Sequence, residues 1–169
     1  MTTSPTRDQA LSADGSVVAP REPGPEEDVM TITATTSVEV TYETGEQYVV
    51  RMRDHEIRTD QPQESGGHDL GPTPVELLVA SMAACTAFYA GRFLDRHGHS
   101  RRGLAVTAEY RTASDPLARV AEVCLAVRVP SGLSERHKTA LLAVVQHCTV
   151  HNTLRRAPEI VIELNEVES

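Results

Sequence analysis

Residues 71–90, GPTPVELLVASMAACTAFYA, decide how this chain folds. Within them, Thr73, Pro74 and Glu76 form the pattern of a helix capping box with proline at the first helical position. The apolar residues that follow keep a helical period as far as Arg96 or His97, and Gly98 is a typical helix stop. We expect a long core helix whose many small residues let a second helix approach closely.

Strands flank this helix on both sides of the sequence. Segments rich in β-branched residues predict strands at 31–42, 47–53, 56–59, 104–111, about 122–129 and 159–164. A second helix is predicted at 134–147, with apolar residues at helical spacing. The order βββ-α-ββ-α-β predicts an α+β domain over residues 29–169, an antiparallel sheet covered by two core helices. Residues 1–28, rich in proline and polar residues, are predicted to be a disordered tail.

Composition excludes several classes of function. The net charge is −8 over 169 residues and lysine and arginine form no cluster, which argues against nucleic-acid binding. The longest mostly apolar stretch, 77–90, is too short to cross a bilayer. Three widely spaced cysteines make no secreted disulfide framework, and no secretory leader is recognisable. We therefore expect a cytoplasmic protein without a membrane partner.

Two cysteines lie where chemistry is possible. Cys85 lies inside the predicted core helix and Cys148 closes the second one. If the helices meet, the two thiols form a redox pair; the competing interpretation is that each is an inert core residue. A thiol that reduces peroxide needs a low pKa, partial access and a partner thiol, and this pair supplies the partner. Cys124 alternates with strand residues and is expected to be a spectator.

The motifs around these cysteines resemble those of a known family. Gly71–Leu78 running into Ala83–Thr86, with Cys148–Leu154 downstream, resemble the osmotically inducible protein C and organic hydroperoxide resistance (OsmC/Ohr) family, in its general OsmC-like branch. The resemblance covers about residues 29–166. It implies an OsmC-like fold, an intertwined homodimer with active sites at the subunit interface, and reduction of organic hydroperoxides without a cofactor or metal.

The resemblance also implies a role for each cysteine. Cys85 would attack the O–O bond and become a sulfenic acid, Cys148 would condense with it to a disulfide, and a dithiol reductant would reopen that bond. Family peroxidases carry a glutamate directly after the helix-opening proline, where this chain has Val75. Glu76, one place later, is either catalytic or only a helix cap.

For the cation that would activate the Cys85 thiol, the sequence offers two candidates. Arg51 and Arg53 on the predicted second strand share one face by period two, and either is the nearest substitute for the family's activating arginine. The alternative is that both are solvated strand charges. The expected substrate pocket has apolar walls on the core helix, namely Leu77, Met82, Phe88 and Tyr89.

Two other functions stay open at this stage. One is a non-catalytic OsmC-like protein that binds an apolar small molecule in the dimer-interface cleft. The other is a metal-binding protein that uses His147, Cys148 and His151 with Cys85, but their spacing matches no paired-ligand pattern. We expect no metal. The leading hypothesis is a thiol-dependent enzyme that reduces organic hydroperoxides.

Overall fold

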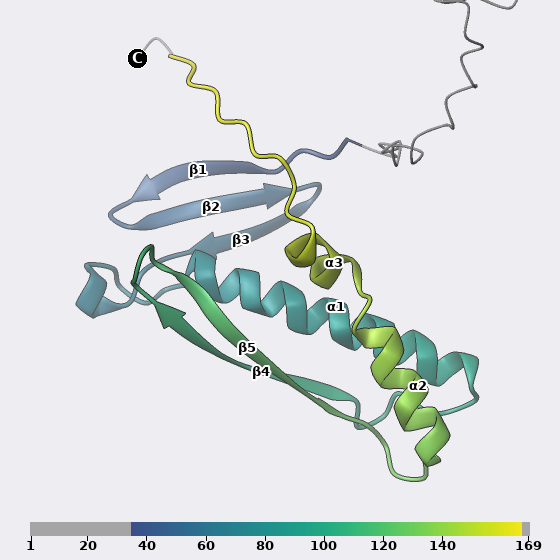
Figure 1. Cartoon of the computed structure of the whole chain (residues 1–169). Helices are drawn as coiled ribbons and strands as arrows, with labels where there is room; N and C mark the ends of the chain where they lie inside the picture. The colour runs from purple at the N-terminus through teal and green to yellow at the C-terminus, as the bar shows by residue number, and fades with distance from the viewer. Residues whose placement is uncertain (1–34, 167–169) are drawn as a thin grey trace, which may run out of the picture. The chain divides into compact units, whose positions relative to one another are not determined.

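A computed structural model describes residues 35–166 of the chain (Figure 1). All its helices and strands lie in the unit Val38–Ser169. The tail predicted for residues 1–28 and the first four residues of the predicted opening strand lie outside the described residues.

Three antiparallel strands form the first sheet, in the order β1-β2-β3. They are β1 (Glu39–Thr44), β2 (Gln47–Met52) and β3 (His55–Thr59). Gly45, at φ 53°, provides the left-handed conformation that the tight turn between β1 and β2 requires. The predicted hairpin and third strand are confirmed, although β1 begins only at Glu39 and the expected strand was too long over residues 35–38.

Helix α1 (Pro74–Arg96) is confirmed as the sequence predicts it. Thr73 accepts a hydrogen bond from the backbone N–H of Glu76, and the Glu76 carboxylate accepts one from the backbone N–H of Thr73. The helix ends at His97, and Gly98 follows in the left-handed conformation at φ 72°. A loop with one turn of 3-10 helix, η1 (Gln63–Ser65), connects β3 to this helix.

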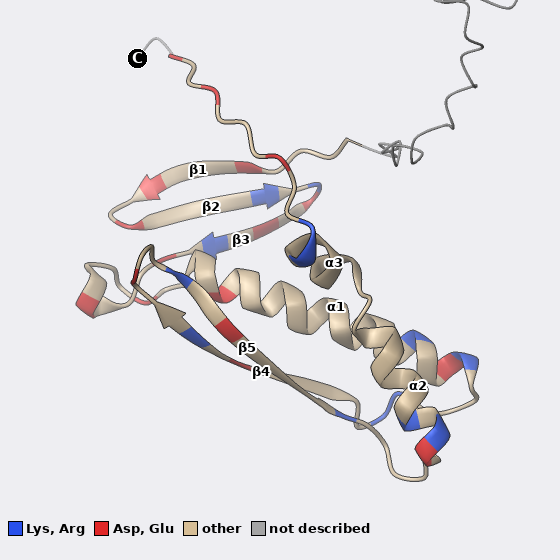
Figure 2. Cartoon of the chain, viewed as in Figure 1, with Lys and Arg blue, Asp and Glu red and all other residues tan. Residues whose placement is uncertain are grey.

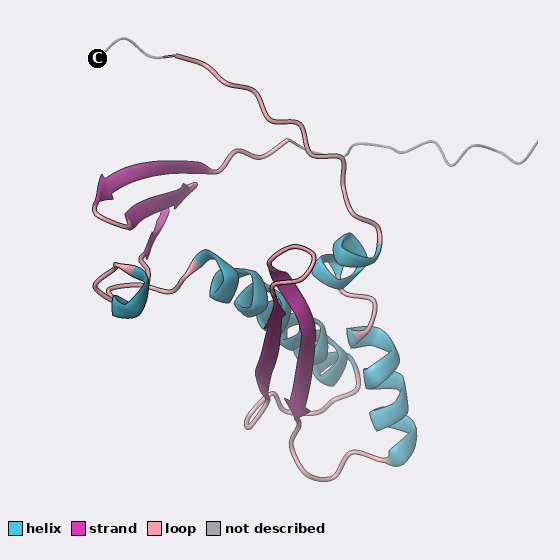
Figure 3. Ribbon diagram, turned by 60° about the vertical axis from the view of Figure 1, so that its left-hand side comes forward, coloured by secondary structure: helices cyan, strands magenta, loops and turns pink. Residues whose placement is uncertain are grey.

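A long antiparallel hairpin packs on α1 (Figure 3). It consists of β4 (Ala105–Ala113) and β5 (Arg119–Arg128). The predicted alternation along β5 is confirmed, because Val123, Leu125 and Val127 are half-buried while their neighbours are exposed. The register shifts between Arg111 and Thr112, so a bulge lies near the start of β5.

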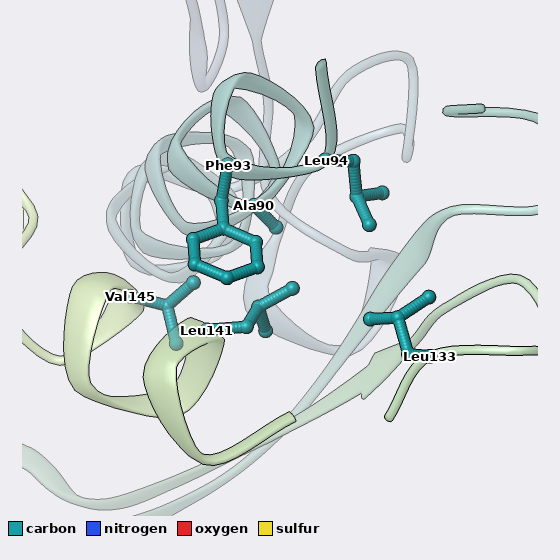
Figure 4. Close-up of a cluster of buried hydrophobic side chains, with 6 residues drawn as sticks. All are labelled: Ala90, Phe93, Leu94, Leu133, Leu141 and Val145. Atoms are coloured by element: carbon teal, nitrogen blue, oxygen red, sulfur yellow. The ribbon is translucent and has the colours of Figure 1, made fainter. Parts of the chain in front are cut away.

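Helix α2 (Glu135–Val145) supplies the other half of the core and packs on α1. Their contact forms a cluster of buried apolar side chains, shown in Figure 4, that contains Ala90, Phe93, Leu94, Leu133, Leu141 and Val145. A further short helix, α3 (Thr149–Arg155), follows α2 and contacts α1. The sequence did not predict α3, because Cys148 at its N-cap makes no side-chain cap hydrogen bond.

The strand predicted at 159–164 is not formed, and this prediction is wrong for the single chain. Residues 156–166 run as an extended segment with no ladder partner, and Ile162 and Leu164 are 90% and 94% exposed. A strand needs a neighbouring strand to satisfy its backbone groups, and no described segment of the chain pairs with this one. The α+β class with antiparallel sheets and core helices is nevertheless confirmed.

Helix α1 is longer than the apolar stretch counted in the sequence. Within residues 35–166 it is the one helix whose length and composition match a membrane span, and 33% of that stretch is buried inside the protein. The same helix packs on β4, α2 and α3. Core helices of soluble proteins meet this criterion as well.

Candidate active site

The two cysteines of the expected redox pair meet in the structure. Cys85 lies near the middle of α1 and is half-buried, and Cys148 lies between α2 and α3 with only 1% of its surface exposed. The side chain of Cys85 is a hydrogen-bonding neighbour of the Cys148 thiol. Both are reduced, and Cys124 is exposed on β5. The packing of α1 on α3 therefore brings together two sulfurs that are remote in the sequence.

Burial raises the pKa of the Cys148 thiol above its ordinary value. The adjacent Cys85 raises this pKa further, whereas hydrogen bonds from the backbone N–H of His151 and from the Thr86 side chain lower it. Because the raising effects prevail, Cys148 keeps its proton at neutral pH. It can donate that proton in a hydrogen bond to the sulfur of Cys85.

The sequence did not single out Thr86 or His151 as neighbours of Cys148. Thr86 is buried directly after Cys85 on α1, and His151 lies in the first turn of α3. His151 was weighed above only as a metal ligand. Its actual contribution is a backbone N–H, which depends on the unpredicted helix α3 and is therefore not visible in the side-chain pattern.

Of the two candidate arginines, Arg51 lies on the first sheet and Arg53 lies in a turn that follows it. The Arg51 guanidinium pairs with Glu56, Nε to Oε1 at 2.7 Å, and also donates to the Thr41 hydroxyl. Arg53 lies outside β2, in the turn to β3, at φ 55°. The prediction that both share one strand face is wrong, because β2 ends at Met52. In the described part of the chain, neither arginine is among the residues that line the cavity next to Thr86 and His151.

Glu76 is engaged as a helix cap. Its Oε2 accepts hydrogen bonds from the backbone N–H of Thr73 at 2.7 Å and from the Thr73 hydroxyl at 3.0 Å. These bonds lower the pKa of the Glu76 carboxyl below its ordinary value. The capping interpretation of the sequence is thus sufficient to explain this residue.

A cavity of about 860 Å³ lies between α1, β5, α2 and α3. Its walls are mainly apolar, and Met82 is the one predicted pocket residue among them. Phe88 and Tyr89 instead line a separate cavity of about 260 Å³, and Leu77 lines neither. The larger cavity also reaches Thr86 and His151, the two residues that hydrogen-bond to Cys148.

Metal-ligand side chains do not converge in the described part of the chain. Over residues 35–166 no group of three or more His, Cys, Asp or Glu residues could hold a metal ion. His147 and His151, weighed above with the cysteines, belong to no such group.

The profile of the OsmC-like protein family matches residues 66–163, which contain α1 and both cysteines of the pair. The chain belongs to the OsmC-like protein family. A comparison with curated proteins finds no match.

Solved structures of OsmC-like proteins share the fold. An OsmC-like protein from Mycoplasma pneumoniae is 18% identical, with a TM-score of 0.65 over 75% of this chain and 91% of that one. An organic hydroperoxide resistance protein OsmC from Legionella pneumophila is 21% identical, with a TM-score of 0.55 over 74% and 92%. An organic hydroperoxide resistance protein from Elizabethkingia anophelis is 20% identical, with a TM-score of 0.59 over 76% and 93%.

Proposed function

We propose that this OsmC-like protein is a thiol-dependent peroxidase that reduces organic hydroperoxides through Cys85 and Cys148. The observation that carries the proposal is the contact between these two thiols, one half-buried and accessible, the other buried and protonated. The family-level role in resistance to peroxides, after which several structural neighbours are named, supports the same chemistry.

The accessible sulfur acts first in this proposal. The Cys85 thiolate attacks the O–O bond of the hydroperoxide, forming a sulfenic acid and releasing an alkoxide that takes a proton to become the alcohol. The S–H of Cys148 stands beside Cys85, and its hydrogen bond supports the negative charge on the attacking sulfur. The roles follow from access, because a hydroperoxide reaches Cys85 more readily than the enclosed Cys148.

The second sulfur then protects the first. Cys148 condenses with the sulfenic acid, so that an S–S bond forms and water leaves. This step prevents further oxidation of Cys85 to the irreversible acids. An external dithiol then reduces the bridge by two exchange steps and becomes a disulfide itself. The residues that carry out the chemistry are these two cysteines, and the proposal requires no metal or organic cofactor.

We propose further that the protein works as an intertwined homodimer in the cytoplasm. The first sheet exposes Val40 and Tyr42, Val38 directly before it is exposed too, and the extended segment 156–166 exposes Ile160, Ile162 and Leu164. Apolar surface of this extent and an unpaired extended segment suit pairing with a second copy. In that assembly the partner's Arg51 or the partner's Arg53 is the candidate cation beside Cys85.

Thiol counting tests the peroxidase. One equivalent of cumene hydroperoxide should remove two of the three free thiols of the unfolded, quenched protein. Cys85→Ser should abolish the loss, Cys148→Ser should leave a sulfenic acid that dimedone traps, and Cys124→Ser should behave like the wild type. If all three thiols of the wild type survive excess hydroperoxide, the proposed function is wrong.

The cavity favours a second candidate, a non-catalytic protein that binds an apolar small molecule. Its volume of about 860 Å³ and its apolar walls suit such a ligand. A binder of this kind would keep its three thiols in the same experiment while still taking up an apolar fluorescent probe.

A further inference from the structure

One arginine lies in the mainly apolar cavity that α1 and β5 line. Arg119, the first residue of β5, is among the lining residues, together with Val75 and Leu78 from the start of α1. Arg119 begins β5, and most of α1 carries no charge (Figure 2). Arg119 is solvent-exposed, and its guanidinium can form a charge-assisted hydrogen bond with an anion.

No carboxylate neutralises this cation in residues 35–166, where the ion pairs join other residues. The Nη1 atom of Arg119 donates to the backbone carbonyls of Asp115 and Leu117, at 3.0 and 3.3 Å. These bonds hold the side chain on the turn between β4 and β5. The head group is therefore positioned by the fold, and its full positive charge is available to a ligand.

Arg119 and the thiols lie at opposite ends of the cavity. Val127, the last residue of β5 that lines it, packs with Val145 against the core cluster, and Cys148 follows Val145 by three residues. Val127 follows Arg119 by eight positions along the strand, a length of about 26 Å. On the opposite wall, the cavity follows α1 from Val75 to Thr86, a length of about 16 Å.

The bulge near the start of β5 contributes to this arrangement. Beyond it, Val120 and Ala121 both line the cavity, whereas strict alternation would place one of them on the other face. The irregular end of the strand thereby keeps Val120 and Ala121 next to Arg119 in the cavity lining.

We propose that Arg119 is a specificity-determining residue, which binds the carboxylate of an elongated apolar hydroperoxide whose O–O bond reaches the thiols. This inference rests on the proposed peroxidase function. The apolar walls hold the chain by burial, and the guanidinium distinguishes an acid from its neutral ester. The distance between the two ends requires a long acyl chain between the carboxylate and the peroxide.

Kinetics with matched substrates test this role. We would compare linoleic acid hydroperoxide with its methyl ester, below their critical micelle concentrations and with dithiothreitol as reductant. Arg119→Gln should raise KM for the acid about tenfold, as expected for the loss of a charge-assisted hydrogen bond, and leave kcat and both constants for the ester unchanged. Arg128→Gln, at the other end of the same strand and equally exposed, is the control and should match the wild type.

Two kinetic outcomes would overturn the inference. One is that Arg119→Gln changes the acid and the ester equally, and the other is that it changes neither. A selective rise in KM with the acid alone supports it.

Direct binding separates this inference from the proposed function. The protein has no tryptophan, so the fluorescence of cis-parinaric acid can be followed without interference. Arg119→Gln should weaken binding of this acid about tenfold, and Arg128→Gln should not. If neither the wild type nor any variant consumes hydroperoxide, but Arg119→Gln still weakens the binding of cis-parinaric acid, the peroxidase proposal fails and the acid site stands. If Arg119→Gln binds the probe as the wild type does, the acid site fails whatever the activity.

Discussion

The hydroxyl oxygens of Tyr89 and Thr149 lie 3.2 Å apart and join α1 to the first turn of α3. Tyr89 follows Cys85 by one helical turn, and Thr149 follows Cys148 directly. The hydrogen bond therefore connects the same two segments as the proposed disulfide. A disulfide forms without backbone movement only when the Cα atoms are within about 7 Å, so a contact that fixes this approach matters for its rate.

Tyr89→Phe should slow the formation of the Cys85–Cys148 disulfide several-fold after a single equivalent of hydroperoxide. The variant keeps the ring but loses the hydrogen bond, which costs about 1 kcal/mol in a typical case. Rapid quenching with an alkylating reagent followed by mass spectrometry gives the rate. Thr149→Val should have the same effect, and the double variant should be no slower than either single one. Additive slowing would mean that the two hydroxyls act independently.

Glu76→Gln should leave peroxide turnover within about twofold of the wild type, because glutamine also serves at this position of a capping box. Thr73→Ala should lower the free energy of unfolding by about 1 kcal/mol, since it removes the N-cap acceptor. Urea unfolding and steady-state kinetics provide the two measurements. A loss of turnover of a hundredfold or more in Glu76→Gln, with unchanged stability, would assign the carboxylate to the chemistry.

The free energy of unfolding should fall as the pH drops through 6.5. His137 Nδ1 lies 3.0 Å from His99 Nε2, so one of these rings must be neutral to accept the hydrogen bond. Burial lowers the pKa of His137 below its ordinary value of 6.5, and His97, His99 and Arg136 add positive charge around it. The unfolded chain then takes up the proton first, which means that acid favours unfolding and that this stability is fully present only above pH 6.5.

Urea titrations between pH 8 and 5 measure that dependence. His137→Gln should flatten the curve in this range, whereas His55→Gln, exposed on β3, should keep the wild-type slope. Carboxylates titrate at lower pH and contribute little in this window. An unchanged slope in His137→Gln would assign the dependence to other groups.

Gly67→Ala should destabilise the loop between β3 and α1 by about 1–3 kcal/mol, because the added methyl group has no room. A Cβ at this position would overlap the backbone carbonyl of Gln61 and lie 2.7 Å from Asp60 Oδ1. Asp60 is fully buried and accepts hydrogen bonds from three backbone N–H groups that hold this loop. Thermal unfolding measures the loss, and Gly66→Asn, at an open left-handed position, should be milder.

Removal of residues 159–169 should convert the proposed homodimer into monomers. The deleted segment carries exposed apolar side chains that no described part of the same chain covers. Light scattering after size exclusion gives the mass. A control that replaces only Glu163 and Glu166 by glutamine keeps the apolar residues and should remain dimeric. A truncated protein of unchanged mass would place the interface elsewhere.

Local patterns were sufficient to predict much of the fold. The limits of α1 follow from Thr73, Pro74 and Gly98, and the inward side of β5 follows from alternation. Whether residues 159–164 form a strand does not depend on local sequence alone, because a strand needs a neighbouring strand, and residues 35–166 supply none. Helix α3 was missed since its N-cap residue is a cysteine without a capping hydrogen bond.

The candidate site was predictable only in part. Cys85 and Cys148 were expected to form a redox pair; the structure brings the two thiols together, and the redox reaction between them stays a prediction. The residues around the two thiols were not predictable from the sequence, because Thr86 and the backbone of His151 reach Cys148 only after α1 and α3 pack together. Likewise, Phe88 and Tyr89 were assigned to one pocket with Met82, although helical rotation directs them to a different cavity.

The three cysteines differ in solvent exposure, so we expect them to react with an electrophile in a fixed order. A bulky electrophile would first meet Cys124 on the open strand, then Cys85, and would reach Cys148 only when α3 moves away from α1. The modification of Cys148 by such a reagent thus reports how often the short helix detaches. Once the sulfurs are bonded that detachment is blocked, and the oxidised protein should resist proteases between residues 146 and 156 better than the reduced one.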